Sequence, residues 1–194
     1  MSDPRIKPIC LASVSAETLS AGEWPPVKTT VVAVGWGRTS ENGFVSSTLQ
    51  QVTLQVVDHQ STTCRPIVTD WTKQFCAGVD GGGKDTCVGD SGGPLMAFTT
   101  SNQWILVGVT SNSFGCAQPI YAGGYTRVAA YHSWITSMTN TSFSTAISSR
   151  LISKWTTLCS SEATVLRSAN LAFESSNSQG LTTMDILASS NIEG

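Results

Sequence analysis

The sequence predicts an all-β fold: an antiparallel β-barrel with a C-terminal helix and a tail that is poorly ordered or weakly helical. Three apolar runs rich in Val, Ile or Thr have the composition of strands, at Thr29–Trp36, Leu49–Val57 and Trp104–Thr110. Turn-forming clusters separate such runs, for example SENG at Ser40–Gly43 and GGG at Gly81–Gly83. Short strands spaced by turns in this way are typical of an antiparallel sheet or barrel.

Two shorter runs, Pro94–Phe98 and Gly124–Val128, complete the expected strands. A helix is expected at Val128–Met138, because apolar side chains recur there at helical spacing and share one face. The apolar residues of this face are Val128, Tyr131, Trp134, Ile135 and Met138. We expect the face to pack against the barrel.

The composition changes near residue 138. Ser137–Gly194 contains 22 Ser or Thr among its 58 residues, with no proline and a single cysteine. Residues 3–138 are therefore interpreted as the folded domain, and residues 139–194 as a Ser/Thr-rich tail that is disordered or weakly helical. Within this tail, Ile147–Leu158 and Ala163–Phe173 have weak amphipathic patterns.

Charge and cysteine content narrow the class of protein. The net charge of -2 provides no basic surface for nucleic acid, and no apolar run is long enough to span a membrane, so neither partner is expected. The six cysteines lack the close spacing of a zinc site, which favours disulfides and no metal. We therefore expect an extracellular protein, although the opening MSDPRIKP shows no signal peptide.

The most specific stretch is DTCVGDSGGP at Asp85–Pro94, which places Ser91 among glycines. Five further stretches occur in a fixed order around it: PICLAS, VGWGRT, FCAG, GCAQP and GGYTRV. Together these motifs resemble the chymotrypsin and trypsin family of serine endopeptidases. The resemblance implies the second barrel of a two-barrel fold, proteolysis of protein or peptide substrates, protein inhibitors as further partners, and no cofactor.

The resemblance also implies roles for the residues of the motif. Ser91 would be the nucleophile, and the backbone N–H groups of Gly89 and Ser91 would hold the oxyanion that forms when Ser91 attacks a carbonyl. Asp85 would form the floor of the substrate pocket and select Arg or Lys, since a carboxylate there binds a cation. Gly123 would form part of the pocket wall.

The substrate-binding edge departs from the family. Where the family has Ser-Trp-Gly, this chain has Ser111, Asn112 and Ser113, which removes an aromatic wall and adds a side chain at the pocket mouth. We expect Ser111 and Ser113 to line the substrate, and Ser113 to narrow the entry for a long basic side chain.

Two further features follow from the resemblance. In the family, a new N-terminal ammonium group made by activation pairs with the residue matched by Asp90. Because no such terminus is visible, we expect Asp90 to be unpaired or to pair elsewhere, and the Asp85 pocket to be loose. The implied disulfides join Cys64 to Cys76 and Cys87 to Cys116, whereas Cys10 has no assigned partner.

A base for Ser91 is missing from the sequence. A serine hydroxyl must pass its proton to a positioned base, but the family's catalytic His and Asp lie upstream of the stretch matched by PICLAS. His59 and His132 match positions far from the nucleophile. We therefore expect a truncated chain that is inactive alone. The alternatives are a catalytically inactive, protease-like binding module and a fragment that does not fold by itself.

Overall fold

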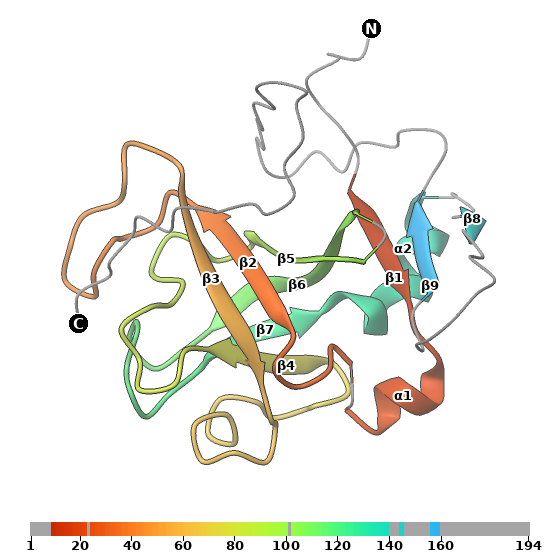
Figure 1. The fold of residues 1–194 in the computed structure, drawn as a ribbon, viewed down its shortest axis with the longest axis horizontal. Coiled ribbons are helices and arrows are strands. Elements are labelled where there is room, and N and C mark those ends of the chain that lie inside the picture. Colours follow the sequence, from red (N-terminus) through yellow and green to blue (C-terminus); the bar gives the residue numbers. More distant parts are fainter. Residues whose placement is uncertain (1–8, 23, 101, 140–143, 146–155, 160–194) are drawn as a thin grey trace, which may run out of the picture.

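Six antiparallel strands close into a barrel in the computed structural model (Figure 1), which describes residues 9–22, 24–100, 102–139, 144–145 and 156–159. The strands follow one another around the barrel in the order β2, β3, β4, β7, β6 and β5, and β5 pairs with β2 to close it. Their bounds are β2 Thr30–Gly35, β3 Gln50–Val57, β4 Gln74–Gly78, β5 Pro94–Phe98, β6 Trp104–Asn112 and β7 Gly123–Arg127. The prediction of an all-β barrel is confirmed.

The sequence did not predict β4, although the five other strands of the barrel lie where their apolar runs indicated. The strand QFCAG has four consecutive buried residues after its first position. A strand buried on both faces has no alternation of polar and apolar residues, and its Gly, Ala and Cys have no strong strand preference. The position of β4 is set by its partners β3 and β7.

Additional elements lie outside the barrel (Figure 1). Strand β1, Cys10–Ser13, runs parallel to β6, and its other edge pairs with β9, Thr156–Cys159, which in turn pairs with β8, Ser144–Thr145. The expectation of a helix at Ile147–Leu158 is therefore wrong for its last three residues, because backbone pairing with β1 fixes them as strand. The remainder of that segment, and Ala163–Phe173, lie outside the described residues.

Short helices flank these strands. Helix α1, Ala16–Ser20, begins after Ser15, whose hydroxyl accepts a hydrogen bond from the Thr18 N–H at 3.2 Å. The C-terminal helix starts as a 3₁₀ turn, η1, Val128–Tyr131, and continues as α2, His132–Thr139. None of the described helices is long and apolar enough to cross a membrane.

The C-terminal helix packs less completely than its sequence predicts. Val128 is buried, but Trp134 is 60% exposed and Met138 is 67% exposed. A 3₁₀ turn advances three residues per turn instead of 3.6, so the α-helical part that follows is rotated relative to the expected apolar face. The expectation that the whole face contacts the barrel is therefore wrong.

The barrel interior is filled by buried apolar side chains, most of which come from alternate positions of the strands. The members with almost no exposure include Val31, Leu54, Leu95, Val107 and Tyr125. A second, smaller cluster surrounds the Cys64–Cys76 disulfide. With a packed interior, the chain presents its chemistry on the loops between strands, chiefly 36–49, 79–93 and 113–122.

Candidate active site

The loop that precedes β5 exposes Ser91. Gly89, two residues earlier, is also exposed and has φ +101°, a conformation that a residue with a Cβ rarely adopts. A Cβ at position 89 would lie 3.1 Å from the Gly37 Cα and 3.7 Å from the Val45 side chain. Glycine is therefore required at this position both by the backbone conformation and by the closeness of the neighbouring loop.

The backbone N–H groups of this loop divide into two sets. The Asp90 N–H donates to the Cys87 carbonyl at 3.0 Å, the Gly92 N–H to the Thr110 carbonyl at 2.9 Å, and the Gly93 N–H to the Asp90 carbonyl at 2.8 Å. Among the described residues, no acceptor is found for the N–H groups of Gly89 and Ser91. Two exposed donors thus lie in the same short loop as the Ser91 hydroxyl, which is the composition of an oxyanion site.

The Asp90 side chain reaches the loop after β2. Its carboxylate accepts the Gly37 N–H at 2.8 Å and the Cys87 N–H at 3.0 Å. The space beside Gly35 and Gly37 is filled by this carboxylate, since a Cβ on either glycine would clash with it. Asp90 thus pairs with backbone groups, which is one of the two alternatives left open by the sequence.

Asp85 is buried, with 4% of its surface exposed. Its carboxylate accepts the Thr86 N–H at 2.8 Å and the Ala117 N–H at 3.3 Å. The pKa of Asp85 is raised to about 6, mainly because burial disfavours the charged form. The two backbone hydrogen bonds lower the pKa, and the charge of the nearby Asp90 raises it, but burial is the largest effect. The carboxylate therefore lacks a cationic partner among the described residues and is suited to bind one.

The walls around Asp85 come from β7 and from the loop after β6. A Cβ on Gly123 would lie 2.7 Å from Asp85 Oδ1 and 3.1 Å from the Tyr125 hydroxyl, so a side chain at position 123 would crowd the carboxylate. The buried Tyr125 hydroxyl lies 3.0 Å from Thr86 Oγ1, and burial raises its pKa. The Cys87–Cys116 disulfide joins this region to the loop after β6, and the looseness of the pocket that the sequence predicted stays a prediction.

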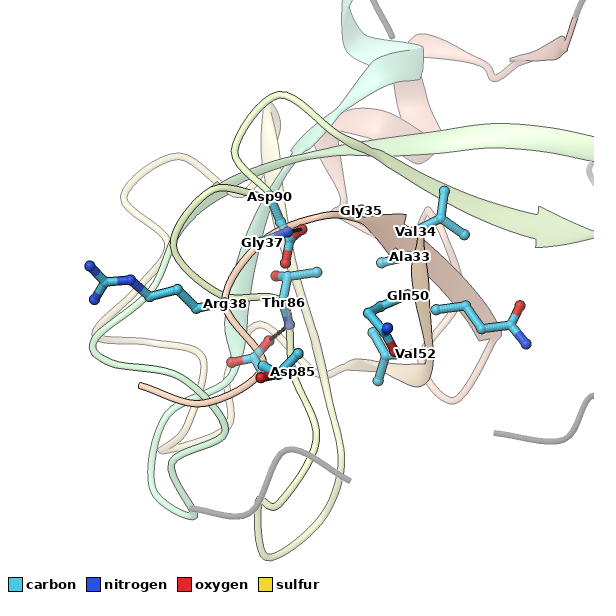
Figure 2. Close-up of a pocket in the computed structure, with 12 residues that line it drawn as sticks. Ala33, Val34, Gly35, Gly37, Arg38, Gln50, Val52, Asp85, Thr86 and Asp90 are labelled. Carbon is cyan, nitrogen blue, oxygen red and sulfur yellow. Dashed lines mark hydrogen bonds between the residues drawn. The ribbon is translucent and has the colours of Figure 1, made fainter. Parts of the chain in front are cut away.

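A small cavity extends between Asp85 and Asp90 and the first two barrel strands. Figure 2 shows the two carboxylates on one side, with Thr86 between them, and the side chains of Ala33, Val34 and Val52 opposite. Arg38 is among the lining residues, but its guanidinium group points away from the carboxylates in this view. The cavity thus has an apolar wall on one side and two acids on the other, and its volume is about 30 Å³.

The burial of Asp85 makes the stability of the protein depend on pH. The pKa of an aspartate in the unfolded chain is about 3.9, and that of folded Asp85 is raised to about 6. The native state therefore binds more protons between these values, and its stability falls as pH rises from about 4 to about 6. Asn does not ionise, so Asp85→Asn should not lose this stability. As the pH rises from 4 to 8, the unfolding free energy of Asp85→Asn should therefore increase by about 2–3 kcal/mol relative to that of the parent.

Urea unfolding at several pH values would measure this gain. Asp80→Asn is the matched control, because Asp80 is an exposed carboxylate in the preceding loop. A constant difference between Asp85→Asn and the parent across this range would show that the Asp85 carboxyl is not shifted by burial.

The residues that the resemblance assigns to the substrate-binding edge lie at the end of β6 and just after it. Ser111, Asn112 and Ser113 are all exposed. The Ser113 hydroxyl donates to the Gly115 carbonyl at 2.6 Å, so it is directed to its own loop. Asn112 donates through Nδ2 to the Ile67 carbonyl at 3.1 Å and thereby joins β6 to the loop between β3 and β4. The family's aromatic wall is thus replaced by a polar tether.

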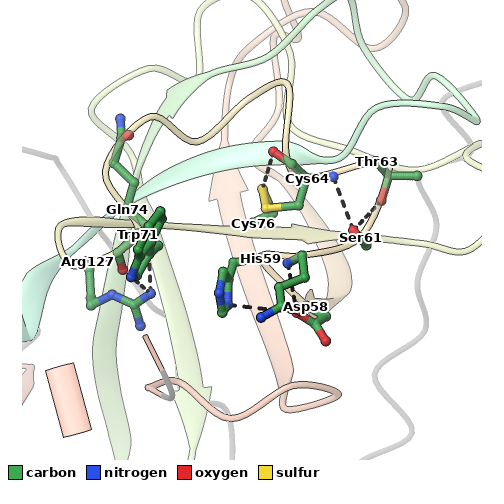
Figure 3. A network of polar contacts seen from close by, with 10 residues as sticks. Asp58, His59, Ser61, Thr63, Cys64, Trp71, Gln74, Cys76 and Arg127 are labelled. Carbon is green, nitrogen blue, oxygen red and sulfur yellow. Dashed lines mark hydrogen bonds and ion pairs between the residues drawn. A yellow bond between two sulfur atoms is a disulfide. The ribbon is translucent and has the colours of Figure 1, made fainter. Parts of the chain in front are cut away.

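Neither histidine is placed to serve Ser91. His59 lies 3.7 Å from Asp58 and stacks on Trp71 with ring centroids 5.7 Å apart, in the loop region after β3 (Figure 3). His132 is the first residue of α2. Among the described residues, no hydrogen bond joins the Ser91 hydroxyl to an imidazole. The expectation for both histidines agrees with this geometry.

Arg127, which lies close to Trp71, has a structural role: it joins β7 to the segment that leads into β4. Its guanidinium group is buried and donates to the carbonyls of Trp71 and Gln74 at 2.8 and 2.9 Å (Figure 3). It also lies 5.4 Å from the centre of the Phe75 ring. Burial lowers the pKa of Arg127 to about 10.

Three residues of the site were not identified from the sequence. Gly37 holds Asp90, Thr86 joins Asp85 to Tyr125, and Ala117 donates to Asp85. Gly37 lies within VGWGRT and Thr86 within DTCVGDSGGP, so both motifs contained the signal. Ala117 lies within GCAQP, but that motif did not reveal its role, because its contribution is a backbone N–H presented by an unusual φ of +58°.

Five cysteines are disulfide-bonded in the part of the chain whose side chains are described. Cys64 is bonded to Cys76 and Cys87 to Cys116, as the resemblance implied, and Cys10 is also disulfide-bonded instead of being an unpaired thiol. Within the described part of the chain, no group of three His, Cys, Asp or Glu side chains could hold a metal ion.

Comparison with known proteins places the chain in a family. The family model described as Trypsin matches residues 2–135. Among curated proteins, the chain is 41% identical over 139 residues to trypsin eta of Drosophila erecta, covering 70% of this chain and 50% of that protein. It is 44% identical over 108 residues to trypsin-1 of Astacus astacus, covering 54% and 44%.

A third relative is transmembrane protease serine 9 of Rattus norvegicus, 40% identical over 132 residues, covering 67% of this chain and 12% of that protein. The chain thus spans half or less of the length of these curated relatives. The match covers the whole barrel and the Ser91 loop, and the fold has the architecture that the motifs implied. The chain therefore belongs to the trypsin family of serine proteases.

Proposed function

We propose that this chain forms the nucleophile-bearing part of a serine endopeptidase that cleaves protein or peptide substrates by acyl transfer. The observation that carries this proposal is the Ser91 loop, in which an exposed hydroxyl lies beside two backbone N–H groups without an acceptor among the described residues. Similarity to proteins named as trypsins supports the same chemistry.

The proposed reaction begins when Ser91 Oγ attacks the carbonyl carbon of the scissile peptide. The hydroxyl proton passes to an imidazole, the carbonyl oxygen becomes negative, and the Gly89 and Ser91 N–H groups donate to it. The imidazole then gives the proton to the leaving amine, and water releases the acyl group from Ser91. Because His59 and His132 lie elsewhere, the imidazole would come from outside these 194 residues, on the same protein or on a partner chain.

Asp85 would give the enzyme a preference for Arg or Lys. Its carboxylate is buried, has only backbone N–H partners among the described residues, and lies beside a glycine, which has no side chain to crowd it. A cationic side chain would supply the missing counter-charge through charge-assisted hydrogen bonds. Ser111 and Ser113 would line the approach to this pocket, and Gly123 would form its wall.

Asp90 would control activation. The cavity behind it has an apolar wall and an acidic end, which suits a chain terminus that carries an apolar side chain and an ammonium group. Such an ammonium group would bind the Asp90 carboxylate beside its bonds to Gly37 and Cys87. Because Gly89 and Ser91 flank Asp90, this pairing would stabilise the oxyanion site.

The protein is proposed to be extracellular. Disulfides persist in oxidising compartments and are rare in the cytosol, and five cysteines are disulfide-bonded in the part of the chain whose side chains are described. Protein inhibitors that present a basic residue to the Asp85 pocket are the expected regulators, since they would use the same contacts as a substrate.

Active-site labelling would test the proposed chemistry. A fluorophosphonate forms a covalent bond with a serine that is activated by a base, so the protein purified from its source should be labelled at Ser91. The recombinant 194-residue chain should react far more slowly because it lacks the base. Ser91→Ala should abolish labelling, and Ser133→Ala, at an exposed serine on α2, should leave it intact. An unlabelled Ser91 in the natural protein would contradict the proposal.

A binding module is the second candidate, favoured by the absence of an imidazole at Ser91 in the described structure. In that case the barrel would hold a peptide or an inhibitor without turnover. Binding of a basic peptide by the natural protein, with neither labelling nor cleavage, would favour this function over the first.

A further inference from the structure

The loop between β2 and β3 makes contacts on both sides of the Asp85 pocket. Near its start, the Gly37 N–H donates to Asp90 and the Arg38 N–H donates to the Val88 carbonyl at 2.9 Å. A few residues on, Glu41 reaches the loop that follows β6, 77 residues away in the sequence. A short segment thus joins the nucleophile loop to the opposite pocket wall.

Glu41 makes two contacts with this wall. Its Oε2 accepts a hydrogen bond from Gln118 Nε2 at 2.6 Å. Its Oε1 lies 2.6 Å from the position that a Cβ on Gly115 would occupy, so the carboxylate lies directly against the Gly115 backbone. A short hydrogen bond to a charged acceptor is stronger than one between neutral groups.

The segment that Glu41 contacts includes backbone in an uncommon conformation. Ala117, between the two contact points, has φ +58°, a left-handed conformation that is unfavourable for a residue with a Cβ. In this conformation its N–H donates to Asp85 Oδ2 and its carbonyl accepts the Gly83 N–H at 2.9 Å. Such a conformation persists only where surrounding contacts hold it.

We propose that Glu41 is a positioning residue for the substrate pocket. Its bond to Gln118 and its contact with Gly115 hold Ala117 in the conformation that orients the Asp85 carboxylate. This inference rests on the proposed function, because it concerns the pocket in which a basic group would bind. Glu41 does not touch that group and acts only through the loop after β6.

Binding of p-aminobenzamidine, a cation that needs no catalytic base, would test the proposal on the full chain. Glu41→Ala and Gln118→Ala are each expected to weaken binding about three- to tenfold, and the double variant no more than the stronger single one. The pH midpoint of binding should move upward in both variants, because the Ala117 N–H stabilises the charged form of Asp85. Glu17→Ala, at an exposed carboxylate on α1, is the control for charge.

The outcomes separate this proposal from the proposed function. If the parent binds no p-aminobenzamidine, the basic specificity is wrong and the role of Glu41 is wrong with it. If the parent binds but Gln118→Ala behaves like the parent, Glu41 acts at most through its charge, and the positioning role is overturned while the basic pocket stands. Parallel losses in both variants, with unchanged thermal unfolding, would support the positioning role.

Discussion

Replacing Asp85 with Ser is expected to weaken binding of p-aminobenzamidine about a thousandfold. The carboxylate is buried, and removing one partner of a buried charge pair costs about 2–5 kcal/mol, since the other charge remains desolvated and unpaired. Serine is small enough to fit beside Gly123 and cannot supply the counter-charge. Isothermal titration at pH 8, where Asp85 is ionised, would measure the loss.

Asp80→Asn is the matched control for this experiment, because it removes an exposed carboxylate of the preceding loop and leaves the pocket unchanged. In the natural protein, Asp85→Ser should reduce cleavage after Arg and Lys to a similar extent and spare cleavage after small apolar residues. An affinity within a factor of about ten of the parent would mean that the amidine binds elsewhere and that Asp85 does not set specificity.

Loss of the Cys87–Cys116 disulfide is expected to cost about 3.5 kcal/mol of unfolding free energy, from the entropy of closing a loop with a sequence separation of 29. The bridge joins the nucleophile loop to the segment that carries Ala117, so its loss should also weaken amidine binding. The double variant Cys87→Ser and Cys116→Ser, measured by urea unfolding and by p-aminobenzamidine titration, tests both effects.

The Cys64–Cys76 disulfide provides the comparison. Its sequence separation is 12, so its removal should cost about 3 kcal/mol, close to the value for the other bridge. It lies in the second apolar cluster instead of beside Asp85. Its loss should therefore destabilise the fold and leave amidine affinity near that of the parent. Equal effects of the two bridges on binding would show that Cys87–Cys116 has no special role at the pocket.

Local patterns in the sequence predicted those parts of the fold that they determine. The alternation in β3 corresponds to a strand with one face in the barrel, and the Val-rich run of β2 corresponds to a strand with three consecutive buried residues. Strand β9 was not predicted, because its pairing with β1 joins segments more than a hundred residues apart. The rotation of α2 was also missed, since the 3₁₀ turn before it leaves no distinct mark in the apolar spacing.

The residues of the candidate site also divide into those that a local motif contains and those that the fold brings together from distant parts of the sequence. The motif around Ser91 contained Asp85, Gly89 and Asp90, because these residues lie within one loop. The contacts of Asp90 with Gly37 and of Glu41 with Gln118 cross 53 and 77 residues, and only the closed barrel brings those loops together. A hydrogen bond between distant polar side chains leaves no periodic signal that a single sequence could reveal.

The closed barrel separates the part of the molecule that provides stability from the part that provides recognition. Every strand of the barrel pairs with a neighbour on both sides within the barrel, so the ends of each connecting loop are anchored independently of the loop's own sequence. Amide hydrogen exchange should accordingly be slow in the strands and fast in the loops. A loop such as 79–84 is therefore a place where the sequence can change without loss of the barrel that carries it.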